Sequence, residues 1–229
     1  MMHRFVPCLS TLPPAQRQLW LALRPAPNLG LVLYGGTAIA VRLGHRPSVD
    51  FDFFTDQPLD KPALFDAFPF LRQATVLQDT PNALTVLIKS EQAADQFVKI
   101  SFFGTISFGR IGEPEMTDDG ILQVASLDDL MATKLKVVLQ RIEAKDYQDI
   151  VAMLAAGVDL SKGLAGARAL YGPAFQPSES LKALVYFEGG DLHRLSLDER
   201  MSLIQAASTV RTLPLVTIQS HHLAANDRG

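Results

Sequence analysis

Two neighbouring stretches decide the fold of this chain: Leu33-Tyr34-Gly35-Gly36-Thr37-Ala38-Ile39-Ala40 and, four residues later, His45-Arg46-Pro47-Ser48-Val49-Asp50-Phe51-Asp52-Phe53-Phe54. The apolar residues 31–33 predict a short buried strand, and the paired glycines after it allow a tight turn. A helical pattern then begins at Thr37 and is expected to end at Gly44. Because the first N–H groups of a helix lack intrahelical partners, such a turn is a ready place for an anion.

The second stretch predicts a strand with two acidic side chains on one face. Apolar residues alternate with Asp50 and Asp52, so the pleat directs both carboxylates to the same side, about 7 Å apart. Two like charges this close repel each other unless a cation lies between them. A phosphate cradle beside a carboxylate pair is the arrangement that metal-assisted phosphoryl or nucleotidyl transfer requires.

Composition limits the classes of protein to consider. The chain has 229 residues, 48% of them apolar, which is typical of a compact globular protein. No apolar run approaches the roughly 18 to 20 residues that span a bilayer, and the first residues lack the apolar core of a secretory signal. Cys8 is the single cysteine, so we expect a cytoplasmic protein. A net charge of −3 without a basic cluster argues against a strongly electrostatic nucleic-acid binder.

The remaining pattern predicts an α+β protein with two domains. Residues 1–125 mix helix and strand signals around one sheet, with a loop-rich part at 104–120, and residues 126–229 are mainly helical. The tail from Pro214 onward is expected to be poorly ordered. Helices are expected over Pro13–Arg24, after the capping residue Asp60, and over Leu127–Ile142, Lys162–Tyr171, Ser178–Glu188 and Leu197–Thr212; further strands over Ala74–Gln78, Ala83–Lys89, Gln96–Phe103 and Ile121–Val124.

The helix expected over Leu127–Ile142 carries two cations on its apolar side. At about 100° per residue, Lys134 and Arg141 fall within the apolar arc, whereas Lys136 faces solvent. A cation in an apolar stripe is costly unless an anion receives it. Two interpretations stay open: the side chains reach water or acidic partners, or they bind the phosphate of a ligand beside the Asp pair. Asp146, in the next helix, borders its core face.

These motifs resemble those of one family. The string Gly-Gly-Thr-Ala…His-Arg-Pro-Ser-Val-Asp-Phe-Asp-Phe-Phe resembles the signature of the polymerase-β-like nucleotidyltransferases and, within them, of the AbiEii/AbiGii-type toxins. About 80 residues later, Lys134-x6-Arg141-x3-Lys145-Asp146-x2-Asp149-Ile150 is similar to the downstream motif of that family. The resemblance covers most of the chain and implies a polymerase-β-like mixed sheet with flanking helices, followed by a helical half that completes the active site.

By this resemblance the chain is a Mg²⁺- or Mn²⁺-dependent, toxin-like nucleotidyltransferase. It implies an NTP as nucleotide donor, tRNA as acceptor and a cognate antitoxin as protein partner, without a membrane. Asp50 and Asp52 would hold the metal and act in catalysis with Lys134 and Asp146. The nucleotide-binding residues would be Gly35, Gly36, Thr37, Arg46, Ser48 and Arg141.

One position departs from the superfamily pattern. Polymerase-β-like enzymes usually carry a third carboxylate on a later strand, where this chain has Ser101, and a hydroxyl is a poorer ligand for Mg²⁺. If that strand lies beside the Asp strand, Ser101 should lie next to the carboxylate pair. Asp95, Glu113 or Glu115 could supply the missing acid from a loop. The departure keeps an alternative open, a nucleotide-binding or interaction module with impaired catalysis; a third hypothesis is phosphotransfer to a small molecule.

Overall fold

The computed structural model describes residues 3–90 and 96–225, which form two compact units. The sheet unit contains the described residues up to Gly109, then 113–125, and the returning segment that begins at Ser220. The helical unit contains 110–112 and 126–219. The boundary between Ala125 and Ser126 coincides with the change from strand to helix.

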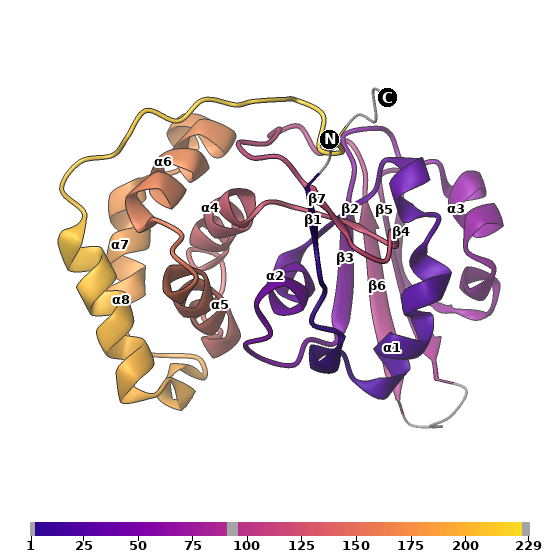
Figure 1. The fold of residues 1–229 in the computed structure, drawn as a ribbon, viewed down its shortest axis with the longest axis horizontal. Coiled ribbons are helices and arrows are strands. Elements are labelled where there is room, and N and C mark those ends of the chain that lie inside the picture. Colours follow the sequence, from indigo (N-terminus) through magenta and orange to yellow (C-terminus); the bar gives the residue numbers. More distant parts are fainter. Residues whose placement is uncertain (1–2, 91–95, 226–229) are drawn as a thin grey trace. The chain divides into compact units, whose positions relative to one another are not determined.

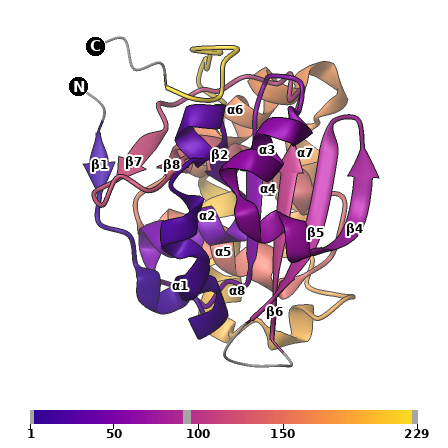
Figure 2. The ribbon, with the colours of Figure 1, turned by 90° about the vertical axis from the view of Figure 1, so that its right-hand side faces the viewer.

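A mixed sheet forms the centre of the sheet unit. Among the described residues its strands lie in the order β1-β7-β8-β2-β3-β6-β5-β4, and Figure 2 shows the last members side by side. β3 runs antiparallel to β2 and parallel to β6, while β4, β5 and β6 are successive antiparallel neighbours. The strands are β1 (Arg4–Phe5), β2 (Val32–Tyr34), β3 (Asp50–Phe54), β4 (Thr75–Thr80), β5 (Ala83–Lys89), β6 (Phe97–Phe103), β7 (Glu115–Thr117) and β8 (Gln123–Val124).

Alternation along β3 and β6 gives this sheet one apolar side. Phe51 and Phe53 are fully buried, Phe53 stacks on Phe102 of β6, and Phe102 stacks on Phe68, the residue after α3. Burying side chains of this size contributes roughly 1.5–3 kcal/mol each. Helices α1 (Pro14–Trp20) and α3 (Lys61–Ala67) cover this side, whereas α2 (Gly35–Leu43) lies on the other side (Figure 1).

The helical unit is built around α4 and α6, which pack closely. A Cβ atom at Gly163 of α6 would lie 2.4 Å from Met131 Cγ of α4, so the approach requires glycine there. α5 packs on α4 and α8, and α7 packs on α6 and α8. The helices are α4 (Leu127–Val137), α5 (Ala144–Ala155), α6 (Leu160–Tyr171), α7 (Pro177–Val185) and α8 (Leu197–Thr209).

The fold class and most element boundaries predicted from the sequence are confirmed. The Asp60 carboxylate accepts the Ala63 N–H at the start of α3, as expected of a capping residue. Gly44 ends α2 in the left-handed conformation, with φ of 69°. Ser196 and Glu199 form the capping box that begins α8.

Two expectations were wrong. The helix that begins at Leu127 ends at Val137 rather than at Ile142, because a new helix starts at Ala144, whose N–H donates to the Asp191 carboxylate. The tail is ordered as far as Ala225, since Leu223 is fully buried. The part predicted to be loop-rich, 104–120, is mainly loop as expected and contains one short strand, β7, which pairs with β1 and β8.

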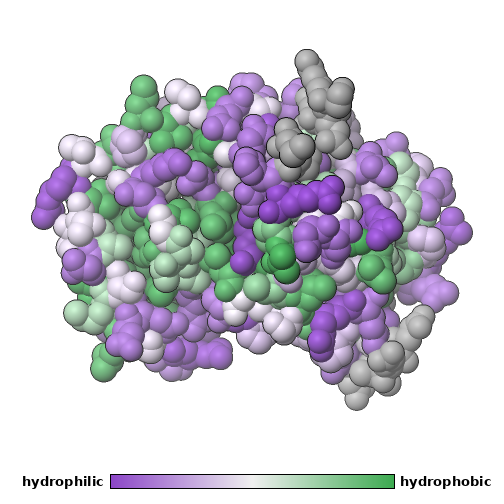
Figure 3. All heavy atoms as spheres, viewed as in Figure 1, coloured by the Kyte–Doolittle hydropathy of each residue, from purple (hydrophilic) through white to green (hydrophobic). Residues whose placement is uncertain are grey.

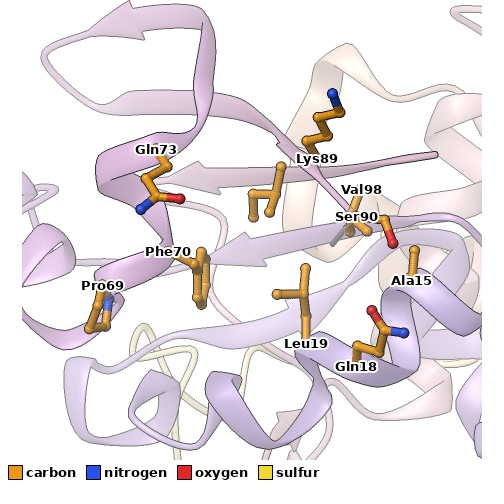
Figure 4. A pocket seen from close by; sticks show the side chains of 10 residues that line it. Ala15, Gln18, Leu19, Pro69, Phe70, Gln73, Lys89, Ser90 and Val98 are labelled. Atoms are coloured by element: carbon orange, nitrogen blue, oxygen red, sulfur yellow. The ribbon is translucent and has the colours of Figure 1, made fainter. Parts of the chain in front are cut away.

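The surface is mixed in character, with patches of hydrophobic side chains among hydrophilic ones on the face seen in Figure 3. A pocket of about 450 Å³ lies between α1, the short helix at 69–73 and strands β5 and β6 (Figure 4). Val98 lines it, and Val98 alternates with Lys99 along β6, so the pocket opens on the side of the sheet opposite to Lys99.

Candidate active site

The predicted carboxylate pair lies on one face of β3. The side chains of Asp50 and Asp52 alternate with the buried Phe51 and Phe53, so they project together from the side of the sheet opposite to the apolar core. In the parallel neighbour β6, Ser101 is the register partner of Asp52. The prediction that Ser101 lies beside the carboxylate pair is therefore confirmed.

The same register brings a cation to this face that the sequence reasoning did not assign to the site. Lys99 is the register partner of Asp50, and its Nζ atom lies 2.9 Å from Asp50 Oδ2. The side chains of Lys99 and Asp50 are 38% and 33% exposed, so the ion pair remains accessible to water. The signal was available in the sequence, because Lys99 precedes Ser101 by two residues and therefore shares its face.

The glycine turn and Asp52 are in close approach. Gly35 has a φ of 73°, and a Cβ atom built on it would lie 2.7 Å from Asp52 Oδ2. Glycine is required here for both the backbone conformation and the space. The carboxylate of Asp52 thus lies against the first residue of α2, where the N–H groups of the helix begin.

Thr37 and Ser48 hold the two stretches together. Their hydroxyl oxygens are 2.7 Å apart, and the Thr37 hydroxyl also donates to the Asp50 carbonyl. Both side chains are buried, so the start of α2 is tied to the start of β3. Arg46, in the loop between them, donates from Nη1 to the Pro47 carbonyl. These contacts give Thr37 and Ser48 a positioning role, whatever ligand the site takes.

The second predicted group, in the helical unit, forms an ion-pair cluster around buried carboxylates. Lys134 Nζ lies 2.6 Å from Asp146 Oδ1 and 2.7 Å from Asp149 Oδ2. Arg141 donates to Asp146 through Nε (2.7 Å) and Nη2 (3.0 Å). Lys134 is 4% exposed and both carboxylates are fully buried. The cluster thus supplies the acidic partners that one of the two interpretations of these cations required.

Arg141 belongs to this cluster, but it does not lie on the helix that was predicted to carry it. It lies beyond the end of α4, in the turn before α5, so it does not share a helical face with Lys134. Burial favours the neutral form of Asp146, but the hydrogen bond from Arg141 and the charge of Lys134 outweigh it and hold the pKa of Asp146 below its ordinary value. Asp146 is therefore a buried, ionised carboxylate with two cationic partners.

Comparison with known proteins decides the family. The model of the nucleotidyl transferase AbiEii toxin family, of type IV toxin–antitoxin systems, matches residues 19–210. The chain belongs to this family. It is a nucleotidyltransferase of the AbiEii toxin type, as both sequence motifs indicated.

Proteins similar to this chain were also found by sequence and by fold. An uncharacterised protein of Aquifex aeolicus (strain VF5) is 30% identical over 174 residues, which cover 73% of this chain and 80% of that protein. Two solved structures share the fold. An H. pylori chain with a provisional assignment as a nucleotidyltransferase has a TM-score of 0.56 at 20% identity, covering 84% of this chain and 91% of its own. MenT4, a nucleotidyltransferase toxin of Mycobacterium tuberculosis H37Rv, has a TM-score of 0.53 at 12% identity, covering 83% and 90%.

The residues of this AbiEii-type chain fit one hydrated divalent ion better than two. Mg²⁺ is usually held by one or two carboxylates and keeps several waters, a donor set that Asp50 and Asp52 can supply. Within residues 3–90 and 96–225 no group of three or more acidic, His or Cys side chains gathers for a metal. Of the acids considered as third ligands, Glu115 pairs with Arg42, and Asp95 lies outside the described residues.

In the described part of the chain, no helix combines the length and the apolar character needed to cross a bilayer.

Proposed function

We propose that this nucleotidyltransferase moves a nucleotide from an NTP to an acceptor with one divalent ion, Mg²⁺ or Mn²⁺, held by Asp50 and Asp52. The observation that carries the proposal is the shared face of these two carboxylates, with Asp52 against the glycine turn at Gly35. A divalent ion would neutralise charge on the transferring phosphoryl group. The N–H groups that begin α2, at Gly35, Gly36 and Thr37, would receive phosphate oxygens.

Aromatic side chains near the carboxylates support a nucleotide as ligand. Phe54 follows Asp52 on the same face of β3 and stacks on Tyr34, with ring centroids 4.8 Å apart. Phe103 and Phe108 lie 5.5 and 6.3 Å from Phe54 and are, like it, only partly buried. Aromatic faces and edges stack with any nucleobase, so this cluster offers a place for the base of the NTP.

The acceptor that we propose is tRNA, and the proposed protein partner is a cognate antitoxin. The type IV toxin–antitoxin description of the family supports a protein partner. The net charge of −3 is compatible with a nucleic acid that is held locally rather than along a broad basic surface. Arg46, beside the start of β3, is the proposed cation at the border of this site. The roles of Lys134, Arg141 and Asp146 toward substrate stay predictions, since each of them is engaged by side chains of the helical unit.

Labelled NTPs, Mg²⁺ and a total tRNA pool test the proposal directly. With the wild-type protein, label should enter tRNA. In Asp50→Asn or Asp52→Asn the incorporated label should fall by more than about 100-fold, because loss of a metal partner outside the first coordination shell already costs roughly 10- to 100-fold. Asp66→Asn is the matched control, because Asp66 is an exposed acid of α3. Tight NTP binding without transfer to any acceptor would favour the impaired module, which Ser101 suggests. Label in a small molecule instead of tRNA would favour the phosphotransfer alternative.

A further inference from the structure

The ion pair between Lys99 and Asp50 places a flexible positive charge inside the carboxylate face. Lys99 Nζ lies 2.9 Å from Asp50 Oδ2, and Ser101, the next residue of β6 on this face, faces Asp52. The two positions that oppose the carboxylates across the strand pair therefore hold an ammonium and a hydroxyl. Neither side chain adds negative charge to the two carboxylates.

The exposure of this pair makes it exchangeable. Half-exposed ion pairs contribute little to stability, because water solvates both partners. Lysine carries its charge on a flexible four-carbon stem and has no fixed geometry of hydrogen bonding. Lys134, by contrast, is 4% exposed and is held by two buried carboxylates. Lys99 can leave Asp50 at little cost, and Lys134 cannot leave its partners.

We infer that Lys99 is an exchangeable counter-ion of the site: it neutralises Asp50 while no divalent ion is bound and turns to the polyphosphate of the NTP when the ion takes its place. The inference rests on the proposed function, since it assumes that the carboxylates bind a divalent ion and that an NTP follows. In a site with a third carboxylate, a second metal ion would bring a further positive charge to the nucleotide. In this chain Lys99 supplies that charge instead. Lys99 is thus a phosphate-binding residue that also weakens metal binding in the absence of nucleotide.

This assignment predicts opposite effects of one substitution on two ligands. In Lys99→Met the competing charge is gone, so Mn²⁺ alone should bind more tightly, by up to about 5-fold. The same variant loses a phosphate contact, so the affinity for an NTP at saturating Mn²⁺ should fall about 10-fold. A lysine that only stabilises the sheet would change neither affinity, or would weaken both together through loss of structure.

The experiment uses the full chain, with Mn²⁺ titrated first without nucleotide and then a non-hydrolysable NTP titrated at saturating Mn²⁺. Lys89→Met is the matched control, because it removes the same charge from an exposed position at the end of β5. Lys99→Arg keeps the charge and should remain close to wild type in both titrations. Thermal melting of each variant shows that it is folded before binding is compared.

Tighter Mn²⁺ binding together with weaker NTP binding in Lys99→Met, and neither in Lys89→Met, is the expected result. Unchanged Mn²⁺ affinity, or unchanged NTP affinity, would overturn the inference. If Lys99→Met does not fold, Lys99→Gln takes its place with the same two expectations. The Mn²⁺ titration contains no acceptor and no NTP, so it tests Lys99 even if the wild-type protein transfers nothing to tRNA. Failure of the inference and failure of the proposed function can therefore be told apart.

Discussion

Asp50 and Asp52 in the sheet unit and Asp146 and Asp149 in the helical unit are both acidic pairs on one element, but their surroundings differ. The Asp50 side chain is 33% exposed and forms an ion pair with Lys99, which is also partly exposed. Both helical carboxylates are fully buried around Lys134. A charge that is removed from water needs oppositely charged or hydrogen-bonding partners within the protein. An exposed charge is solvated by water, which a ligand can replace. The difference indicates that the helical cluster maintains its unit, and it supports our proposal that the sheet pair binds a ligand.

Replacing Lys134 should produce the largest loss of stability. Lys134→Met leaves two buried carboxylates facing each other, and breaking a buried ion pair on one side costs about 3–5 kcal/mol. Lys136→Met removes the same charge from the same helix at a more exposed position and should change the free energy of unfolding by less than about 0.5 kcal/mol. Urea denaturation measures both. Wild-type stability with lost transfer in Lys134→Met would instead assign Lys134 to the chemistry.

The next largest effect should come from Asp129, a third buried acid of the helical unit, as a dependence of the free energy of unfolding on pH. Asp129 accepts the N–H groups of Ile111 and Gly112 and the Ser126 hydroxyl, yet burial raises its pKa from 3.8 to about 6. The folded state therefore binds the proton more tightly than the unfolded state. The stabilisation is complete below about pH 4 and is lost as pH rises through 6.

The pH profile of unfolding separates Asp129 from Asp146. Between pH 4 and 7 the wild-type free energy of unfolding should contain a decrease on the order of 2–3 kcal/mol that Asp129→Asn lacks. The lowered pKa of Asp146 acts in the opposite direction, because its stabilisation is present above 3.8 and is lost only as pH falls further. Parallel profiles of wild type and Asp129→Asn would show that Asp129 is ionised in the fold throughout this range.

The contrast between the two pairs was only partly predictable from the sequence. Strand alternation was sufficient to place Asp50 and Asp52 together, since it depends only on neighbouring residues. The apolar arc correctly marked Lys134 as buried, but it could not show that its partners come from the next helix. Local patterns specify which face a side chain takes, and the contacts on that face depend on how distant segments pack.

The same reason explains the errors at element ends. Nothing in residues 138–142 signals the end of α4, because the N–H of Ala144 is received by Asp191, nearly fifty residues later. Leu223 was assigned to a poorly ordered tail, because a single apolar residue among polar neighbours gives no periodic signal. The pairing of Lys99 with Asp50 required the parallel register of β3 and β6, which a sequence pattern suggests but does not fix.

Gly35→Ala should have an intermediate effect that connects stability with the site. The backbone conformation with φ of 73° costs a non-glycine residue about 1–2 kcal/mol, and the new Cβ atom would also displace the Asp52 carboxylate. Gly120→Ala is the matched control, since Gly120 has φ of 69° and no neighbour within 4 Å of the added atom. Both variants should lose similar stability in urea, but Gly35→Ala alone should weaken Mn²⁺ binding. Equal Mn²⁺ affinity in both would remove Asp52 from the proposed metal site.

Asp50→Asn should have the smallest effect on stability and sharpen the comparison most. The half-exposed pair with Lys99 is worth about 0–1 kcal/mol, and removing one of two like charges relieves repulsion from Asp52, so the free energy of unfolding should change by less than about 0.5 kcal/mol. Asp146→Asn, the corresponding change in the buried cluster, should cost about 3–5 kcal/mol, because Lys134 and Arg141 lose a shared carboxylate. Mn²⁺ affinity should show the reverse order, with a large loss in Asp50→Asn and little change in any Asp146→Asn protein that remains folded. If Asp50→Asn were as destabilising as Asp146→Asn and bound Mn²⁺ like wild type, the carboxylates of β3 would be structural too, and the distinction between a structural cluster and a proposed metal-binding pair would fail.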